Sequence, residues 1–246
     1  MPKTKDLAAP KWPVVMGRHI ENILGVFGHG RHLALLISLL LLFLLSPFVA
    51  AARYGTVVIN TAGVIVLLSG TYAMSEQRRL FVVTLIGSAV AVATNLLVVV
   101  FQIEWMAIAW QGFTLLLLGL FSVAILEDVL RRGQISVDKI CGAICVYLLI
   151  GFAWALGYGI IELINPGSFS GLPEIEANDH VGRVMQLRYF SFATLTTLGY
   201  GDILPRSPVA RTLATLEAMT GQIYLTVLIA RLVGLHIVHS TSRAGD

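Results

Sequence analysis

Long apolar stretches separated by short polar connections dominate the chain. Six of them reach the length of about 20 residues that a helix needs to cross roughly 30 Å of hydrocarbon. They cover residues 33–52, 56–74, 80–101, 105–126, 140–163 and 209–237. A seventh stretch, 187–196, lies between the last two and is too short to cross. The pattern predicts an all-α membrane protein with six transmembrane helices and a re-entrant segment between the fifth and the sixth.

The composition agrees with this assignment. Of the 246 residues, 57% are hydrophobic and 13% charged, whereas a soluble domain carries roughly a quarter of charged residues. The net charge of +3 is small, and the basic residues stand beside apolar stretches, so we do not expect a nucleic-acid partner. Cys141 and Cys145 share a helical face within an apolar stretch, which favours reduced, packed thiols over a disulfide or a zinc site.

Lysines and arginines mark one side of the membrane. Lys11 and Arg18 precede the first stretch, Arg78–Arg79 follow the second, and Arg131–Arg132 follow the fourth. Short cytoplasmic connections carry an excess of such residues. We therefore expect both termini to be cytoplasmic and the connection between the fifth and sixth spans to face outside. The predicted location is the cell membrane, plasma or inner, with lipid as a partner.

The outer connection contains the most informative segment of the chain. The stretch 187–196 has the apolar character of a short helix and runs into Thr-Leu-Gly-Tyr-Gly-Asp at 197–202. Non-helical backbone at membrane depth must line water or be buried in protein. Backbone carbonyls that all turn to one side can replace the hydration shell of a cation. That geometry requires left-handed φ at alternate positions, which glycine adopts freely, and Gly199 and Gly201 have this spacing.

Residues 194–202 resemble the signature of the potassium channel superfamily, whose filter often reads TVGYG, with Leu198 here in place of valine. The resemblance extends from residue 140 to about 239, as outer helix, pore helix, filter and inner helix. Over the first four spans it rests on their number alone. It implies a passive, potassium-selective channel subunit. Because one filter strand cannot surround an ion and the motif occurs once, it also implies a homotetramer.

The resemblance implies a role for particular residues. Potassium ions would bind at the carbonyl oxygens of Thr197, Leu198, Gly199 and Tyr200, with Gly201 completing the filter. The supports behind it would be Tyr189, Thr194, Thr196 and Asp202, with Tyr189 anchoring Asp202. Ala193 stands where relatives often carry a glutamate. Gly221 occupies the hinge position of the last span, where tight helix packing is the alternative. The residues expected to line the cavity and the gate are Gln222, Leu225, Ile229 and Val233.

Glu217 is an acid inside a membrane helix, which is costly and marks a candidate functional site. One hypothesis is that it faces the pore helix, hydrogen-bonds Ser191 or Thr194, and partly replaces the glutamate missing at Ala193. The other is that it faces the central cavity and attracts cations.

The interpretation divides the chain into four parts. Residues 1–32 form a cytoplasmic N-terminus, whose stretch 14–27 is compatible with a helix in the inner interface. Residues 33–133 form a four-span domain that resembles a voltage sensor in span number only, because its fourth span has no arginine. Residues 134–240 form the pore domain, and 241–246 a short cytoplasmic tail. The histidines His19, His29 and His32 are expected to be solvated at the inner interface, with pH sensing as the alternative.

Other functions were open to a sequence of this kind. A channel that passes several monovalent cations is one, although the intact Gly-Tyr-Gly-Asp argues against it. The ion-transporting subunit of a potassium uptake system is another, but such chains carry four degenerate pore loops and this one has a single loop. The sequence offers no paired carboxylates, Cys/His site or nucleophile elbow, so we expect no enzyme and no cofactor, only potassium ions in the filter.

Overall fold

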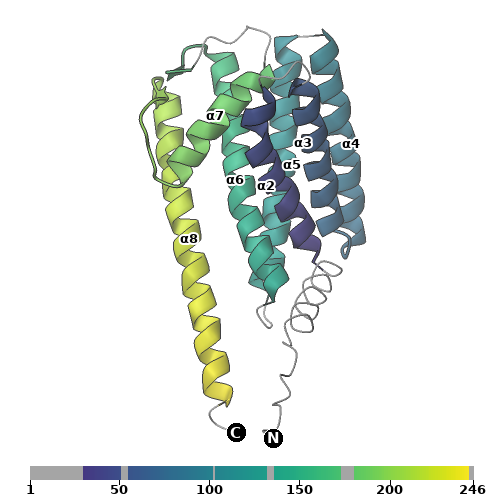
Figure 1. Cartoon of the computed structure of the whole chain (residues 1–246), viewed down its shortest axis with the longest axis vertical. Coiled ribbons are helices and arrows are strands. Elements are labelled where there is room, and N and C mark those ends of the chain that lie inside the picture. The colour runs from purple at the N-terminus through teal and green to yellow at the C-terminus, as the bar shows by residue number, and fades with distance from the viewer. Residues whose placement is uncertain (1–29, 51–54, 102, 132–135, 173–179, 244–246) are drawn as a thin grey trace, which may run out of the picture.

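A computed structural model describes residues 30–50, 55–101, 103–131, 136–172 and 180–243, with side chains in the last helix as far as Arg231. Seven helices and a two-stranded sheet lie in these ranges (Figure 1). In chain order they are α2 (Arg31–Ala50), α3 (Gly55–Ala73), α4 (Arg78–Phe101), α5 (Glu104–Leu130), α6 (Val137–Ile164), β1 (Phe169–Ser170), α7 (His180–Leu195), β2 (Leu204–Pro205) and α8 (Pro208–Arg243). The predicted interfacial helix at 14–27 and the tail at 244–246 lie outside the described residues.

Helices α2 to α6 run alternately up and down beside one another, and α8 stands apart on the far side of α7 (Figure 1). We call α2–α5 the four-helix region, and α6–α8 with the two strands the pore region. The regions meet where α5 and α2 pack on α6. Their shared core contains Leu39, Phe121, Ile125 and Leu149, all at most 1% exposed. Because lipid is as apolar as these side chains, close van der Waals packing and not removal from water holds the two regions against one another.

Among the described residues, four helices are long and apolar enough to cross a membrane: Arg78–Phe101, Trp105–Leu130, Val137–Ile164 and Pro208–Arg231. They coincide with the third to sixth predicted spans. The first two predicted spans coincide with α2 and α3, whose described apolar parts, Arg31–Ser46 and Val58–Ala73, are shorter. The arginine pair Arg78–Arg79 begins α4 rather than lying in a connection as expected.

The expectation for His32 is wrong. Its side chain is 2% exposed, and its Nε2 lies 3.2 Å from Asp128 Oδ2, while its backbone N–H donates to Asp138 Oδ1. The helix ends that carry these acids, on α5 and α6, enclose the imidazole. Cys145 is a free, buried thiol, as is Cys141, and donates to the His32 carbonyl at 3.3 Å. Sequence spacing could not reveal this cluster, because His32 is about a hundred residues away from Asp128, Asp138 and Cys145. His19 and His29 lie outside the described residues.

Candidate functional site

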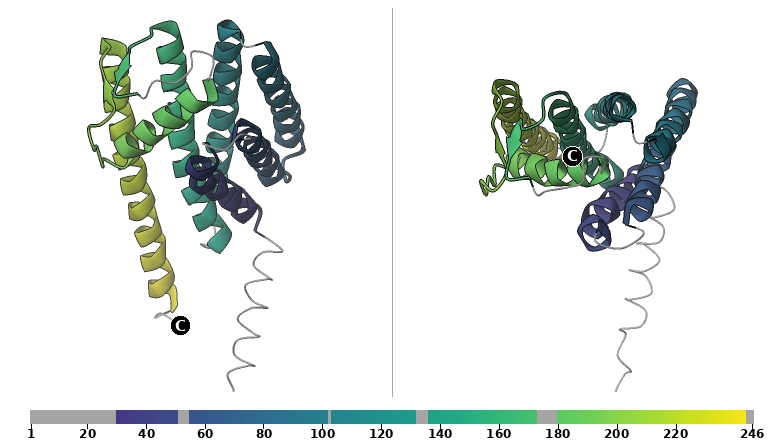
Figure 2. Two further views of the ribbon diagram at one scale, coloured as in Figure 1. Left: turned by 45° about the horizontal axis from the view of Figure 1, so that its top comes forward. Right: turned by 90° about the horizontal axis from the view of Figure 1, so that it is seen from above.

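Helix α7 crosses obliquely between α6 and α8 and ends at Leu195, where the chain turns into the segment 196–202 (Figure 1). Seen from above, this segment lies at the edge of the molecule opposite α3 and α4 (Figure 2). All of its residues are exposed in the single chain. The short helix and non-helical continuation agree with the predicted re-entrant segment.

The backbone of this segment alternates in handedness. Thr197 has φ 58°, Gly199 φ 56° and Gly201 φ 80°, so every second residue is left-handed. The glycine spacing predicts two of these positions. Thr197 was not foreseen, because a β-branched residue at positive φ is an outlier that sequence does not signal. Such strain persists only where the surroundings enforce it and is typical of functional sites.

The end of α7 holds the start of this segment. The Ala193 carbonyl accepts hydrogen bonds from the amides of Leu198 and Gly199, at 2.8 and 3.1 Å, and Thr197 N–H donates to the Thr194 carbonyl at 3.0 Å. The Thr196 hydroxyl donates to Phe192 O at 2.6 Å. These bonds use carbonyls that a helix end leaves free. Ala193 thus supports the segment with its backbone carbonyl.

Asp202 is held from behind by Tyr189 of α7. The Tyr189 hydroxyl beside the Asp202 carboxyl lowers the pKa of Asp202 below its ordinary value. Asp202 Oδ1 also accepts from the Ile203 N–H at 3.0 Å. On the other side, a Cβ at Gly171 would lie 1.8 Å from the Asp202 carbonyl oxygen, so this contact requires glycine, which also has φ 82°. Tyr189 thus lies beside Asp202, and its role as the anchor of this acid stays a prediction.

A small sheet fixes the outer connection beside this acid. Strand β1 pairs antiparallel with β2, with Phe169 opposite Pro205. The buried Glu162, near the end of α6, accepts hydrogen bonds from the N–H groups of Gly167 and Phe169 at 2.8 and 3.1 Å. A carboxylate that accepts two backbone amides is a strong local clamp. Sequence reasoning missed Glu162, whose position at a helix end resembles that of an ordinary interfacial acid.

Glu217 lies on α8 and is 0% exposed. Its Oε1 accepts from the Ser191 hydroxyl at 2.5 Å and its Oε2 from the Tyr158 hydroxyl at 2.6 Å. The structure thus brings Glu217 against the pore helix through Ser191, as the first hypothesis holds. Tyr158 was not foreseen, although a phenol within an apolar helix is expected to seek a partner. Its ring packs edge-to-face with Phe169 and Phe190.

Gly221 lies one turn beyond Glu217, where α8 passes the end of α7. A Cβ at this position would lie 2.3 Å from the Leu195 carbonyl oxygen, which also accepts from the Tyr147 hydroxyl at 3.4 Å. The close approach of two backbones explains the glycine, in agreement with the packing alternative. A hinge at Gly221 stays a prediction.

The side of α8 that continues below this contact is largely uncovered. Gln222 is exposed, Leu225 is half-buried, and Ile229 is 59% exposed. Val233 lies in the part of α8 whose side chains fall outside the described set. In the segment beyond α7, Leu198 and Tyr200 are 55% and 68% exposed. In the single chain, Leu198, Tyr200 and Ile229 thus leave large apolar side chains uncovered.

The sequence of the pore region matches that of known ion channels. Residues 140–235 match the family model described as "Ion channel". The inward rectifier potassium channel Kirbac3.1 of Paramagnetospirillum magnetotacticum is 35% identical over 86 residues, which are 33% of this chain and 24% of that protein. The pore region is thus similar to ion channels, and to one potassium channel among them. The chain spans only about a quarter of the length of that channel, so the match concerns the pore region and not the four-helix region.

Two further relatives match a larger part of their own length. Protein LctB of Bacillus caldotenax is 29% identical over 100 residues, 41% of this chain and 74% of the relative. Protein LctB of Geobacillus stearothermophilus is 29% identical over 122 residues, 49% of this chain and 89% of the relative. No solved structure matches the chain significantly.

Proposed function

We propose that the chain is one of four identical subunits of a potassium-selective channel in the plasma or inner membrane. The observation that carries this proposal is the left-handed φ at Thr197, Gly199 and Gly201 within the Thr-Leu-Gly-Tyr-Gly sequence. Alternating handedness turns successive carbonyls of a strand to the same side. Four such strands around an axis present rings of oxygens that replace the hydration shell of a potassium ion.

In this mechanism the ions occupy sites between the carbonyls of Thr197, Leu198, Gly199 and Tyr200. The Thr197 hydroxyl adds the innermost oxygen. Helix α7 directs its C-terminal, negative end towards the cavity below the filter, which favours a cation there before it enters. Conduction is passive, and no step requires a cofactor.

The proposed assembly follows from surfaces that the single chain leaves uncovered. Leu198 and Tyr200 are more than half exposed, as is Ile229. Filter side chains with large apolar surfaces hold the pore diameter only if they pack against protein. Fourfold symmetry brings a neighbouring copy to this surface and closes the ring of carbonyls at the same time.

The support residues keep the filter in place from behind. Tyr189 holds Asp202, and Glu217 joins α8 to α7 through Ser191 and to α6 through Tyr158. We infer that Glu217 replaces, from the inner helix, the carboxylate that Ala193 lacks. Gln222, Leu225, Ile229 and Val233 line the inner cavity, where an apolar constriction gates by dewetting.

The proposed topology has six spans and two cytoplasmic termini. It is supported by the alternation of α2 to α6, which gathers Arg31, Arg78 and Arg131 at the same end of the bundle (Figure 1). This is the distribution that the positive-inside rule gives to a cytoplasmic face. Helix α5 carries no arginine or lysine, so the proposed gating does not use an arginine array in the fourth span.

Ion flux through liposomes tests the proposal. Purified protein is reconstituted with a potassium gradient or an equal sodium gradient, and the expected result is flux for potassium only. Gly199→Ala is expected to abolish it, because alanine is strained at φ 56°. Gly157→Ala is the matched control, since a Cβ at Gly157 meets no atom within 4 Å. Equal fluxes would identify the less selective cation channel, and flux that survives Gly199→Ala would contradict the proposed filter.

A further inference from the structure

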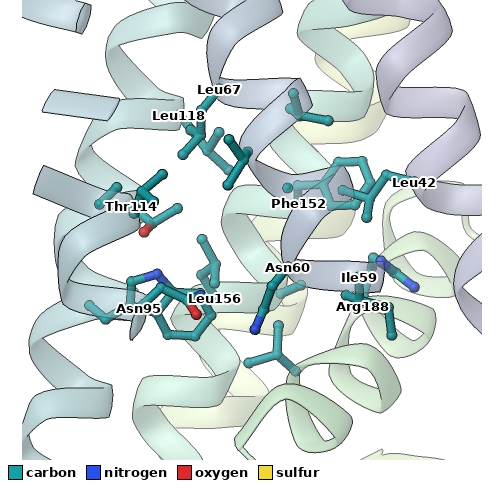
Figure 3. A pocket seen from close by; sticks show the side chains of 18 of the residues that line it. Leu42, Ile59, Asn60, Leu67, Asn95, Thr114, Leu118, Phe152, Leu156 and Arg188 are labelled. Atoms are coloured by element: carbon teal, nitrogen blue, oxygen red, sulfur yellow. The ribbon is translucent and has the colours of Figure 1, made fainter. Parts of the chain in front are cut away.

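A cavity of about 180 Å³ lies between the four-helix region and the pore region. Most of its wall is apolar, with Leu39, Leu67, Leu118, Phe152 and Leu156 among the lining residues (Figure 3). An apolar cavity of roughly 150 Å³ is already large enough to bind benzene. The space between the regions is thus sufficient for part of a hydrocarbon chain.

The polar lining residues gather at one end of this cavity. Figure 3 shows Asn60, Asn95 and Arg188 on one side and Leu67 and Leu118 on the other. Asn60 lies near the start of α3 and Asn95 near the end of α4, and these ends are adjacent in the antiparallel bundle. The cavity therefore has an amphipathic lining, with its polar end towards the predicted outer side and its apolar end towards the middle of the bundle.

Arg188 brings a buried charge to the polar end. Its side chain is 9% exposed, donates to the Ser46 hydroxyl, and stacks near the rings of Phe43 and Phe152, at 6.0 and 5.6 Å from their centroids. The ion pairs among the described residues do not include it. Burying an arginine is costly unless an anion compensates it. Its planar fork matches a carboxylate or phosphate group.

Thr114 adds a buried polar group to the lining. The Thr114 hydroxyl oxygen is buried and has no hydrogen-bond partner within the described part of the chain. Buried hydroxyls are normally satisfied by protein or by a bound molecule. A buried arginine with no acidic partner and a buried hydroxyl with no hydrogen-bond partner among the described residues, together with a long apolar wall, define the chemistry of a ligand that would fit this cavity.

We propose that this cavity binds an anionic amphiphile, with its acid group at Arg188 and its acyl chain along Leu118 and Leu67. The acid group is a carboxylate or a phosphate ester, so a free fatty acid and an anionic phospholipid share the recognised chemistry. The membrane around the protein supplies both. This site lies outside the filter and does not depend on its selectivity.

The first test needs no variant. Delipidated protein in a neutral detergent is titrated with a brominated fatty acid, and the saturable quenching of Trp110, which lines the cavity, is measured. Trp110→Phe identifies its share of the signal. The matched alcohol of equal chain length is titrated in parallel. The acid is expected to bind at least about tenfold more tightly, because its charged hydrogen bonds exceed neutral ones by more than 1.4 kcal/mol. Equal affinities would overturn the proposal.

Two variants, Gly63→Leu and Arg188→Gln, test the apolar space and the polar end of the cavity separately. Gly63 lines the cavity, and a Cβ there meets no atom within 4 Å, so Gly63→Leu fills the space without a backbone clash. Gly119→Leu is the matched control on a helical glycine outside the cavity lining. Gly63→Leu is expected to lose the saturable quenching and Gly119→Leu to keep it. Arg188→Gln is expected to bind acid and alcohol alike. Retained binding in Gly63→Leu, at unchanged thermal stability, would contradict the site.

A last arm distinguishes the two sources of the acid group. Phosphatidylglycerol and phosphatidylcholine with the same brominated chains replace the fatty acid. If the anionic phospholipid quenches Trp110 in preference to the zwitterionic one, the membrane lipid itself is the ligand. If only the fatty acid does so, the ligand is a free acid. If neither lipid nor acid gives saturable quenching, the proposal fails.

Discussion

The two regions of this protein differ in how fully their buried polar groups are hydrogen-bonded. In the pore region, Glu217 and Glu162 each accept two hydrogen bonds, from side chains in one case and from backbone amides in the other. In the four-helix region, the Gln111 and Thr114 oxygens have no partner within the described residues, and a cavity lies beside Thr114. Satisfied polar networks fix one geometry, whereas unsatisfied ones leave room for change or for a ligand. We infer that the pore region holds a single geometry, whereas the four-helix region can change its packing or accept a ligand.

Two glycines, Gly221 and Gly70, allow this contrast to be tested, although Gly151 of the pore region, like Gly70, lies against an aromatic ring, that of Phe192. A Cβ at Gly221 would meet the backbone carbonyl of Leu195, whereas a Cβ at Gly70, in the four-helix region, would meet the ring of Phe121. A backbone atom at a helix end moves only with its helix. The end of an aromatic side chain can turn or shift. Identical substitutions at these positions therefore compare the tolerance of the two regions directly.

The largest expected effect is that of Gly221→Ala. The new methyl would lie 2.3 Å from the Leu195 oxygen, so α7 or α8 must move and displace the filter that follows α7. Overpacking of this kind costs about 1–3 kcal/mol, and we expect loss of potassium flux together with a lower Tm. Gly157→Ala, where a Cβ meets no atom within 4 Å, is expected to leave both unchanged. Equal effects in the two variants would refute the close-packing account of Gly221.

Glu217→Gln is expected to have the next largest effect. The amide group presents one donor nitrogen where Glu217 has two acceptor oxygens. Ser191 can then donate to the Gly151 carbonyl at 2.8 Å, whereas Tyr158 loses its acceptor wherever the nitrogen faces it. A buried unsatisfied donor costs about 1–3 kcal/mol. We predict a changed open probability in single-channel records, and a change of the same sign in Ser191→Ala. An unchanged open probability with altered affinity for an inner blocker would instead support the cavity-facing hypothesis.

Tyr189→Phe is expected to shift the response to external acid. The Tyr189 hydroxyl lowers the pKa of Asp202, so the charged form that supports the filter is present above that pKa and is lost as the pH falls through it. Without the hydroxyl the pKa rises, and protonation begins at a higher pH. The pH of half-maximal current, measured with the outer solution varied, is therefore expected to move upward. A downward shift or none would contradict this role of Tyr189.

The smallest effect is expected for Gly70→Ala. The Phe121 ring lies 2.7 Å from the new Cβ position and must turn or shift, which a side chain can do more readily than the Leu195 backbone at Gly221. A reduction of Tm without loss of potassium flux is the predicted outcome. If Gly70→Ala silences the channel as Gly221→Ala does, the contrast between the regions is lost.

Sequence patterns predicted the helices of the pore region well, because a contiguous motif fixes both local conformation and depth. Both ends of α6 and the start of α8 fall within three residues of the predicted ones, and Gly199 and Gly201 are left-handed as predicted. Helix α7, however, begins seven residues before the predicted 187, and α8 ends six residues after the predicted 237. What sequence could not supply depends on contacts between distant segments. The partner of Glu217 on α6, the burial of His32 between two helix ends, and the burial of Arg188 against Ser46 all depend on packing that no local pattern encodes.

The central claim is potassium selectivity through a fourfold filter, and its most direct test is a reversal potential. Purified protein is inserted into a planar bilayer with potassium chloride on one side and an equal concentration of sodium chloride on the other. The account predicts a large reversal potential of the sign that potassium selectivity gives, and its loss, with the current, in Gly199→Ala. A reversal potential near zero, from a protein that conducts, would contradict it.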